Sequence, residues 1–265
     1  MIYDSTTIYR TMESCCAMDI RRTGRARFGN RAGYCRNVFG RFIEKIVGFP
    51  GRNGFTQAVS ETSNSFSEDI DLVQINSEPI NPILKRMREK LDFLGTKRTV
   101  KQHIHNNTVI YRFDSEMQPI TNMRLKIEIN TREHLNILGL KEIPYEIKNE
   151  WFSGQCRVTG YEIEEVLSTK LRALYQRKKG RDLFDLYWAL THLDIDTEKL
   201  IHCYKIYIKN IVSIPPTQKQ FLANMNEKMM DKEFNEDIRL VLKQGVEFDN
   251  ETAWEVVRRE LVGKI

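Results

Sequence analysis

The sequence of 265 residues lacks any apolar run that approaches the roughly 18 residues needed to span a bilayer, and it lacks an apolar signal segment at its N-terminus. Its five cysteines show no C-x-x-C spacing and have no histidines at ligand distance, which argues against a zinc site and a disulfide framework. Internal repeats and low-complexity linkers are absent as well. We therefore expect a cytoplasmic globular protein with reduced thiols, long enough for one large domain or two modest ones.

Excess charge is confined to the N-terminal segment. Residues 1–60 hold ten Lys and Arg against four Asp and Glu, whereas the rest of the chain holds 31 against 32. Nine of those ten bases are arginine, glycines interrupt every candidate periodic segment, and no sustained helical or alternating pattern precedes Phe39. The segment is interpreted either as a basic arm that binds RNA or as a stretch that was not selected to fold.

From Phe66 onward the sequence becomes periodic, with alternating stretches that predict strands and apolar spacings of three and four that predict helices. The predicted strands are 69–73, 108–113, 123–130 and a short one at 158–161. The predicted helices are 81–95, 163–178, 182–192 and, in the remainder, 197–211, 216–225, 233–243 and 251–262. The fold class is therefore α+β, with a small mixed sheet and helices over residues 61–160 and a mostly helical domain over 161–265.

The first strand carries Asp69 and Asp71, which project from the same face a few ångströms apart. This geometry suits magnesium, which prefers carboxylate, water and phosphate oxygens, although most D-x-D pairs are solvated surface residues. Glu128 lies on the polar face of the strand at 123–130. It is either a solvent-facing residue of a half-buried sheet or, if the two strands are neighbours, the third carboxylate of a two-metal site.

Two candidates lie in the helical half. Lys170 falls on the apolar stripe of its helix, where it either extends to solvent or holds triphosphate oxygens as a point charge. Asp182 stands at a helix start, where capping alone could explain it. Arg181 and Asp185, at i and i+4, could form a surface ion pair, and the bases of residues 177–181 form a candidate contact for phosphate or RNA.

Together these segments resemble the AbiEii/AbiGii family of nucleotidyltransferase toxins, the toxin half of type IV toxin–antitoxin pairs. The resemblance covers about residues 60–265, and its longest segment is the most specific. It rests on F-S-E-D-I-D-L at 66–72, L-K-I-E-I-N-T-R-E-H at 125–134, W-F-S-G at 151–154, E-E-V-L-S-T-K-L-R-A-L-Y-Q-R-K-K-G-R-D-L-F-D-L at 164–186 and A-W-E-V-V-R-R-E-L at 253–261.

The resemblance implies transfer of a nucleotide from an NTP to an acceptor, which in some relatives is the 3′ end of tRNA. It also implies an antitoxin encoded nearby, a role in phage defence and a helical half that completes the active site. The expected cofactors are two Mg²⁺ ions. The implied magnesium ligands are Asp69 and Asp71, and the strand geometry adds Glu128. The implied essential pair is Lys170 and Asp182, and the expected nucleotide contacts are Ser67 and Lys170. The expected RNA or phosphate contacts are Arg172, Arg177 and Arg181.

One family feature is missing. The family has a G-G-T or G-G-S loop upstream of the D-x-D, in a segment like F-x-G-G-T-A-L-x-K, whose glycine backbone cradles the triphosphate. This chain has Phe49–Gln57 there, without adjacent glycines. Back-translation of that stretch, read one base later, permits F-Q-G-G-T-A-L-R-K throughout. We therefore hypothesise that residues from near the start to about Ser60 are translated out of frame, and that activity is very low; otherwise Gly51 and Gly54 form a divergent loop.

Two alternatives remain open from the sequence. The first is a non-catalytic remnant that binds RNA or an antitoxin through the basic turn. The second is a small-molecule nucleotidyltransferase, as in antibiotic modification, which would share the fold and differ only in its acceptor.

Overall fold

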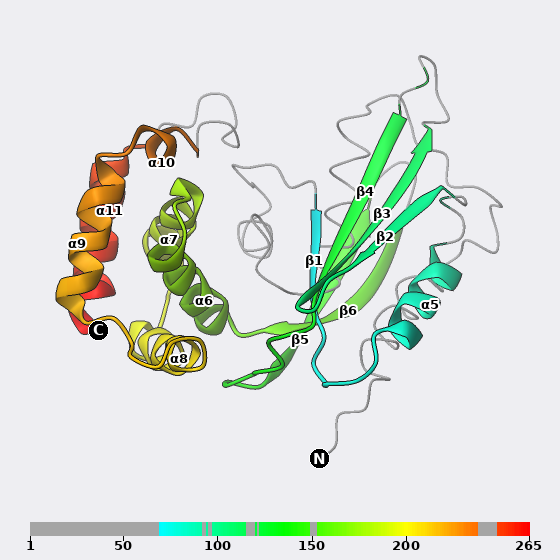
Figure 1. Ribbon diagram of the computed structural model, residues 1–265, viewed down its shortest axis with the longest axis horizontal. Coiled ribbons are helices and arrows are strands. Elements are labelled where there is room, and N and C mark those ends of the chain that lie inside the picture. Colours follow the sequence, from blue (N-terminus) through cyan, green and yellow to red (C-terminus); the bar gives the residue numbers. More distant parts are fainter. Residues whose placement is uncertain are drawn as a thin grey trace. The chain divides into compact units, whose positions relative to one another are not determined.

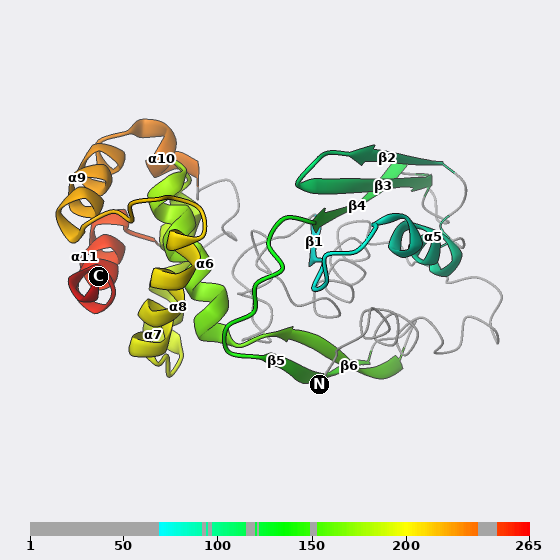
Figure 2. The ribbon, with the colours of Figure 1, turned by 60° about the horizontal axis from the view of Figure 1, so that its bottom comes forward.

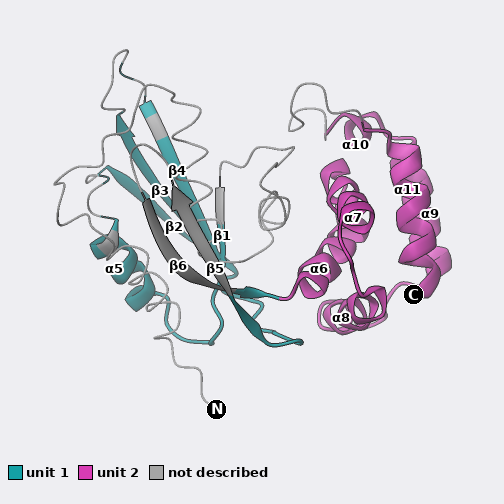
Figure 3. Cartoon of the chain, turned by 180° about the vertical axis from the view of Figure 1, so that it is seen from behind, with its two compact units in different colours: residues 1–54, 67–161 teal, residues 55–66, 162–265 magenta. Residues whose placement is uncertain are grey.

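The computed structural model describes residues 69–91, 94, 97–114, 120, 122–148, 153–237 and 248–265. The predictions made for residues 1–68, including the out-of-frame segment, the Phe49–Gln57 stretch and Ser67, lie outside the described residues. The chain divides into two compact units, with the boundary after Tyr161 (Figure 3). Within the described part, no helix is both long and apolar enough to cross a membrane.

The first unit contains a four-stranded mixed sheet, as the α+β prediction requires (Figure 1). Its strands, in the order β1-β4-β3-β2, are β1 (Asp69–Val73), β4 (Asn122–Asn130), β3 (Asn106–Asp114) and β2 (Arg98–Gln102). The β1–β4 pair is parallel and the other two pairs are antiparallel. β2 was not predicted, and it is joined to β3 by the short turn that contains His103 and His105.

One face of this sheet is apolar and is covered by helix α5 (Asn81–Lys90), as Figures 1 and 2 show. Leu125, Ile127 and Ile129 of β4 are buried in one cluster with Ile83 and Met87 of the helix. Alternation along β4 leaves its polar residues on the other face of the sheet. The helix is shorter than predicted and ends at Lys90, although the leucines that follow it still belong to the same core.

A second, two-stranded sheet pairs β5 (Leu140–Lys148) with β6 (Ser153–Tyr161). The sequence predicted only the last residues of β6 and missed β5. Pro144 lies within β5 and argues against a strand on sequence alone, because proline cannot donate to the ladder and is confined to edge strands. Among the described strands, β5 pairs with β6 alone, which leaves one edge of β5 without a described neighbour, and proline is tolerated at such an edge.

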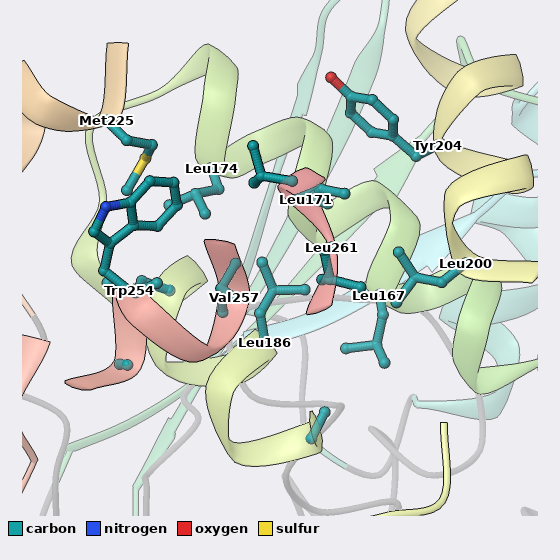
Figure 4. Packing of buried hydrophobic residues seen from close by; sticks show 14 of the residues in the cluster. Leu167, Leu171, Leu174, Leu186, Leu200, Tyr204, Met225, Trp254, Val257 and Leu261 are labelled. Carbon is teal, nitrogen blue, oxygen red and sulfur yellow. The ribbon is translucent and has the colours of Figure 1, made fainter. Parts of the chain in front are cut away.

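The second unit is helical, as predicted, and its helices bury one apolar cluster (Figure 4). Leu167, Leu171 and Leu174 follow the expected stripe and are fully buried with Val257 and Leu261. The elements are α6 (Ile163–Gln176), α7 (Gly180–His192), α8 (Thr197–Lys209), α9 (Gln218–Met229), α10 (Lys232–Asp237), α11 (Asn250–Glu260) and the 3₁₀ turn η2 (Val262–Lys264). α10 was predicted to run from 233 to 243, but residues 238–247 lie outside the described part.

Candidate active site

The strands that carry Asp71 and Glu128 are neighbours in the sheet. In the parallel β1–β4 register, Asp71 is paired with Glu128 and Asp69 with Lys126. Paired residues of adjacent strands share a face and lie about 5 Å apart. The adjacency of the two strands, on which the three-carboxylate hypothesis depended, is therefore present in the fold.

An ion pair lies on this face of the sheet. Lys126 Nζ lies 2.5 Å from Glu128 Oε1, and both side chains are partly exposed. Asp71 is also partly exposed, whereas the side chain of Asp69 lies outside the described set. Among the described side chains, no three His, Cys, Asp or Glu residues are placed to hold a metal ion. The predicted cluster includes Asp69, so this observation does not bear on it.

In the second unit, Lys170 and Asp182 lie close together inside the pair of helices α6 and α7. Lys170 does not extend to solvent: its side chain is 2% exposed, and Nζ donates to Asp185 Oδ2 at 2.7 Å. Asp182 Oδ1 lies 3.8 Å from Nζ. Arg177 donates to both oxygens of Asp182, each at 2.6 Å. Lys170, Asp182 and Asp185 are thus buried together, and Arg177, whose side chain is 45% exposed, pairs with Asp182 from the solvent side.

Helix capping does not account for Asp182. The N-cap of α7 is Lys179, whose side chain makes no capping hydrogen bond, and the backbone N–H of Arg181 donates to Asp237 Oδ2 at 3.4 Å. Asp182 itself is fully buried and is committed to Arg177 instead. A buried carboxylate needs such a charged partner, because an uncompensated charge is costly away from water.

Asp185 is the residue that sequence reasoning misplaced. The expected surface pair between Arg181 and Asp185 is wrong: Asp185 is 2% exposed and binds Lys170. Arg181 pairs with Asp237 at 3.4 Å. Burial raises the pKa of Asp185 to about 6, although Lys170 opposes the rise. The sequence did contain a signal that Asp185 is buried. Asp182, Asp185 and Leu186 lie at i, i+3 and i+4, so the two carboxylates share a helix face with a leucine.

The basic turn at residues 177–181 is neutralised from within the chain. Lys178 pairs with Asp231 at 2.7 Å, and this hydrogen bond raises the pKa of Lys178. Lys179 lies 3.3 Å from Asp237, which also faces Arg181. The acids come from α10 and the residue before it, about fifty positions later, so local spacing could not reveal them. Every described base of this turn therefore has an acidic partner.

The third arginine proposed for RNA contact, Arg172, sits elsewhere. Its guanidinium carbon lies 5.3 Å from the centre of the Tyr207 ring, in cation–π geometry. The Tyr207 hydroxyl in turn donates to the buried Glu165 at 2.7 Å. Arg172 thus belongs to the contact between α6 and α8, whereas Arg177 and Arg181 belong to the basic turn.

A further cation, Lys228 of α9, was not anticipated. Its Nζ donates to the carbonyl oxygens of Leu174 and Tyr175 at 2.5 and 2.7 Å. These are orphan carbonyls of the last turn of α6, which need a donor from elsewhere. Burial lowers the pKa of Lys228 to about 8. Lys228 thereby fixes the end of α6 immediately before the basic turn.

Comparison with solved structures identifies the class of the fold. MenT4, a nucleotidyltransferase toxin from Mycobacterium tuberculosis H37Rv, matches with a TM-score of 0.53 and 13% sequence identity, over 100% of this chain and 91% of that one. At this identity the likeness shows a shared fold, which is that of a nucleotidyltransferase toxin. The comparison with curated proteins gave no match.

The sequence itself identifies the family. Residues 62–259 match the model of the family described as "Nucleotidyl transferase AbiEii toxin, Type IV TA system". The chain therefore belongs to the AbiEii family of nucleotidyltransferase toxins, and the resemblance inferred from its motifs is confirmed.

Proposed function

We propose that this chain transfers a nucleotide from an NTP to a hydroxyl of an RNA acceptor, with the 3′ end of tRNA as the first acceptor to test. The observation that carries the proposal is the β1–β4 register, in which Asp71 is paired with Glu128 and Asp69 precedes it on the same face. Carboxylate oxygens suit magnesium, so this donor set fits two Mg²⁺ ions. When bound, such ions stabilise the attacking and leaving oxygens of the displacement.

In the second unit, we assign Lys170 to the phosphate oxygens and Asp182 to the acceptor hydroxyl, which it would orient or deprotonate. Ser67 is assigned to the nucleotide. Lys170 Nζ is buried against Asp185, so a phosphate reaches it only when this pair opens. Asp185 and Arg177, which hold Lys170 and Asp182, are then positioning residues.

The family description includes a type IV toxin–antitoxin system, and we propose that a cognate antitoxin encoded nearby restrains this protein in the cytoplasm. The out-of-frame hypothesis for residues 1–60 adds that turnover by this chain is very low. Sequencing the coding DNA across these codons tests that hypothesis, because an uninterrupted G-G-T segment in the shifted frame would identify an intact parent enzyme.

The activity is tested with labelled NTPs, tRNA and excess protein, so that slow turnover is still detected. Asp71→Ala should abolish magnesium-dependent incorporation, because it removes a ligand that no neighbour can replace. Asp114→Asn is the matched control, since it removes an exposed carboxylate from the far end of β3. Incorporation that survives in Asp71→Ala would remove the metal assignment.

The two alternatives have distinct outcomes. RNA binding that persists without magnesium and ignores NTPs would favour a non-catalytic remnant. The acidic partners of the basic turn weigh against that surface as a ready RNA site. Incorporation into a small molecule but not into RNA, in an acceptor screen, would favour the small-molecule enzyme.

A further inference from the structure

A lysine lies within the carboxylate face of the sheet. Lys126 and Glu128, at i and i+2 of β4, project from the same face, and Lys126 Nζ lies 2.5 Å from Glu128 Oε1. In the β1–β4 register, Lys126 is paired with Asp69, and Glu128 with Asp71. A cation therefore lies beside Glu128, on the sheet face that carries the carboxylates assigned to magnesium.

The pair is short and partly shielded from solvent. The side chain of Lys126 is 23% exposed and that of Glu128 is 32% exposed. A charge-assisted hydrogen bond of this length occupies one carboxylate oxygen and offsets part of the negative charge on the face. A metal ion that binds Glu128 Oε1 must displace the ammonium group, and a cation bound to the other carboxylate oxygen is repelled by it.

We propose that Lys126 is an internal counter-ion of the carboxylate face: it occupies Glu128 in the metal-free protein and competes with the divalent cation for that carboxylate. This inference rests on the proposed function. Lys126 then sets the metal concentration at which the site fills, and it limits carboxylate repulsion while the site is empty.

The test is a titration of the metal-free full-length protein with Mn²⁺, with free ion followed by electron paramagnetic resonance. Lys126→Met keeps the length of the side chain and removes its charge; we expect Mn²⁺ to bind about tenfold more tightly, which corresponds to about 1.4 kcal/mol. Lys126→Arg, which keeps the charge, should bind as the wild type does. Lys85→Met removes the same charge from an exposed position on α5, the helix on the opposite face, and should change nothing.

Lys126→Gln provides a second uncharged variant if Lys126→Met does not fold. A second readout is the melting temperature: without metal, the uncharged variants should melt below the wild type, and Mn²⁺ should raise their melting temperature more. Mn²⁺ affinity that is unchanged or weaker in both uncharged variants overturns the inference while leaving the metal site intact. Absence of binding by the wild type, or equal binding by Asp71→Asn, overturns the metal site itself and the inference with it.

Discussion

Gly180, the first residue of α7, offers a sharp test of how the second unit is held together. A Cβ atom built at this position would lie 2.2 Å from the carbonyl oxygen of Phe234 and 3.3 Å from its carbonyl carbon. Both atoms are backbone, so no side-chain rotation can relieve the clash. Gly180→Ala must therefore move α10 away from the start of α7.

The magnitude follows from what that movement disturbs. Phe234 is fully buried, and forcing extra atoms into a packed region typically costs about 1–3 kcal/mol. The ion pairs of Asp237 with Lys179 and Arg181 would loosen as well, adding roughly 0–1 kcal/mol each. Alanine recovers at most about 1 kcal/mol of helix propensity. We expect a net loss of about 2 kcal/mol in the free energy of unfolding.

Urea unfolding, followed by tryptophan fluorescence, measures this loss, because two tryptophans report from the second unit. Gly263→Ala is the matched control: its added Cβ would meet the nearest backbone oxygen, that of Arg258, at an ordinary 3.5 Å. That variant should unfold within about 0.5 kcal/mol of the wild type. If Gly180→Ala is as stable as Gly263→Ala, the close packing of α10 on α7 is wrong.

Two further predictions concern charge. Asp185→Asn should destabilise the protein by about 2–3 kcal/mol, below the full penalty for a lone buried cation, because Asp182 still lies 3.8 Å from Lys170 Nζ. Because the pKa of Asp185 is raised in the folded state, the folded protein binds a proton on this carboxyl more tightly than the unfolded chain does. The contribution of Asp185 to the free energy of unfolding therefore declines as pH rises from about 4 to about 6. Urea unfolding at several pH values should show a weaker pH dependence of stability in Asp185→Asn than in the wild type. Asp237→Asn removes the shared partner of two bases, so RNA affinity should rise severalfold and depend more steeply on salt in filter binding. Glu255→Gln, which removes an exposed pair on α11, is its control, and an equal rise there would exclude a specific effect of the basic turn.

The sequence predicted the elements whose signals are local. β1 and β4 were found because β-branched residues alternate along them, and α6 because its leucines recur at helical spacing. β5 was missed because a proline within a run argues against a strand, and the pairing that accommodates Pro144 is known only from the fold. The acidic partners of the basic turn, Asp231 and Asp237, were missed because they are far from the turn in the sequence and are brought to it only by the fold.

The motif at 164–186 contains residues that serve the stability of the fold and residues assigned to catalysis, and the sequence alone cannot separate the two roles. Lys170, Asp182 and Asp185 are buried and carry charges that offset one another, and Arg177 pairs with Asp182, so these residues contribute to stability whatever their part in chemistry. Loss of activity in Lys170→Ala or Asp182→Ala would therefore not by itself identify a catalytic residue. Lys170→Ala leaves the buried Asp185 without its cation, and Asp182→Ala removes the partner of Arg177 and one of the two carboxylates near Lys170. Variants that keep the free energy of unfolding while losing incorporation are required. The carboxylate face differs in this respect: Asp71 and Glu128 are partly exposed, so replacing either disturbs the fold little, and loss of incorporation there reports on the chemistry directly.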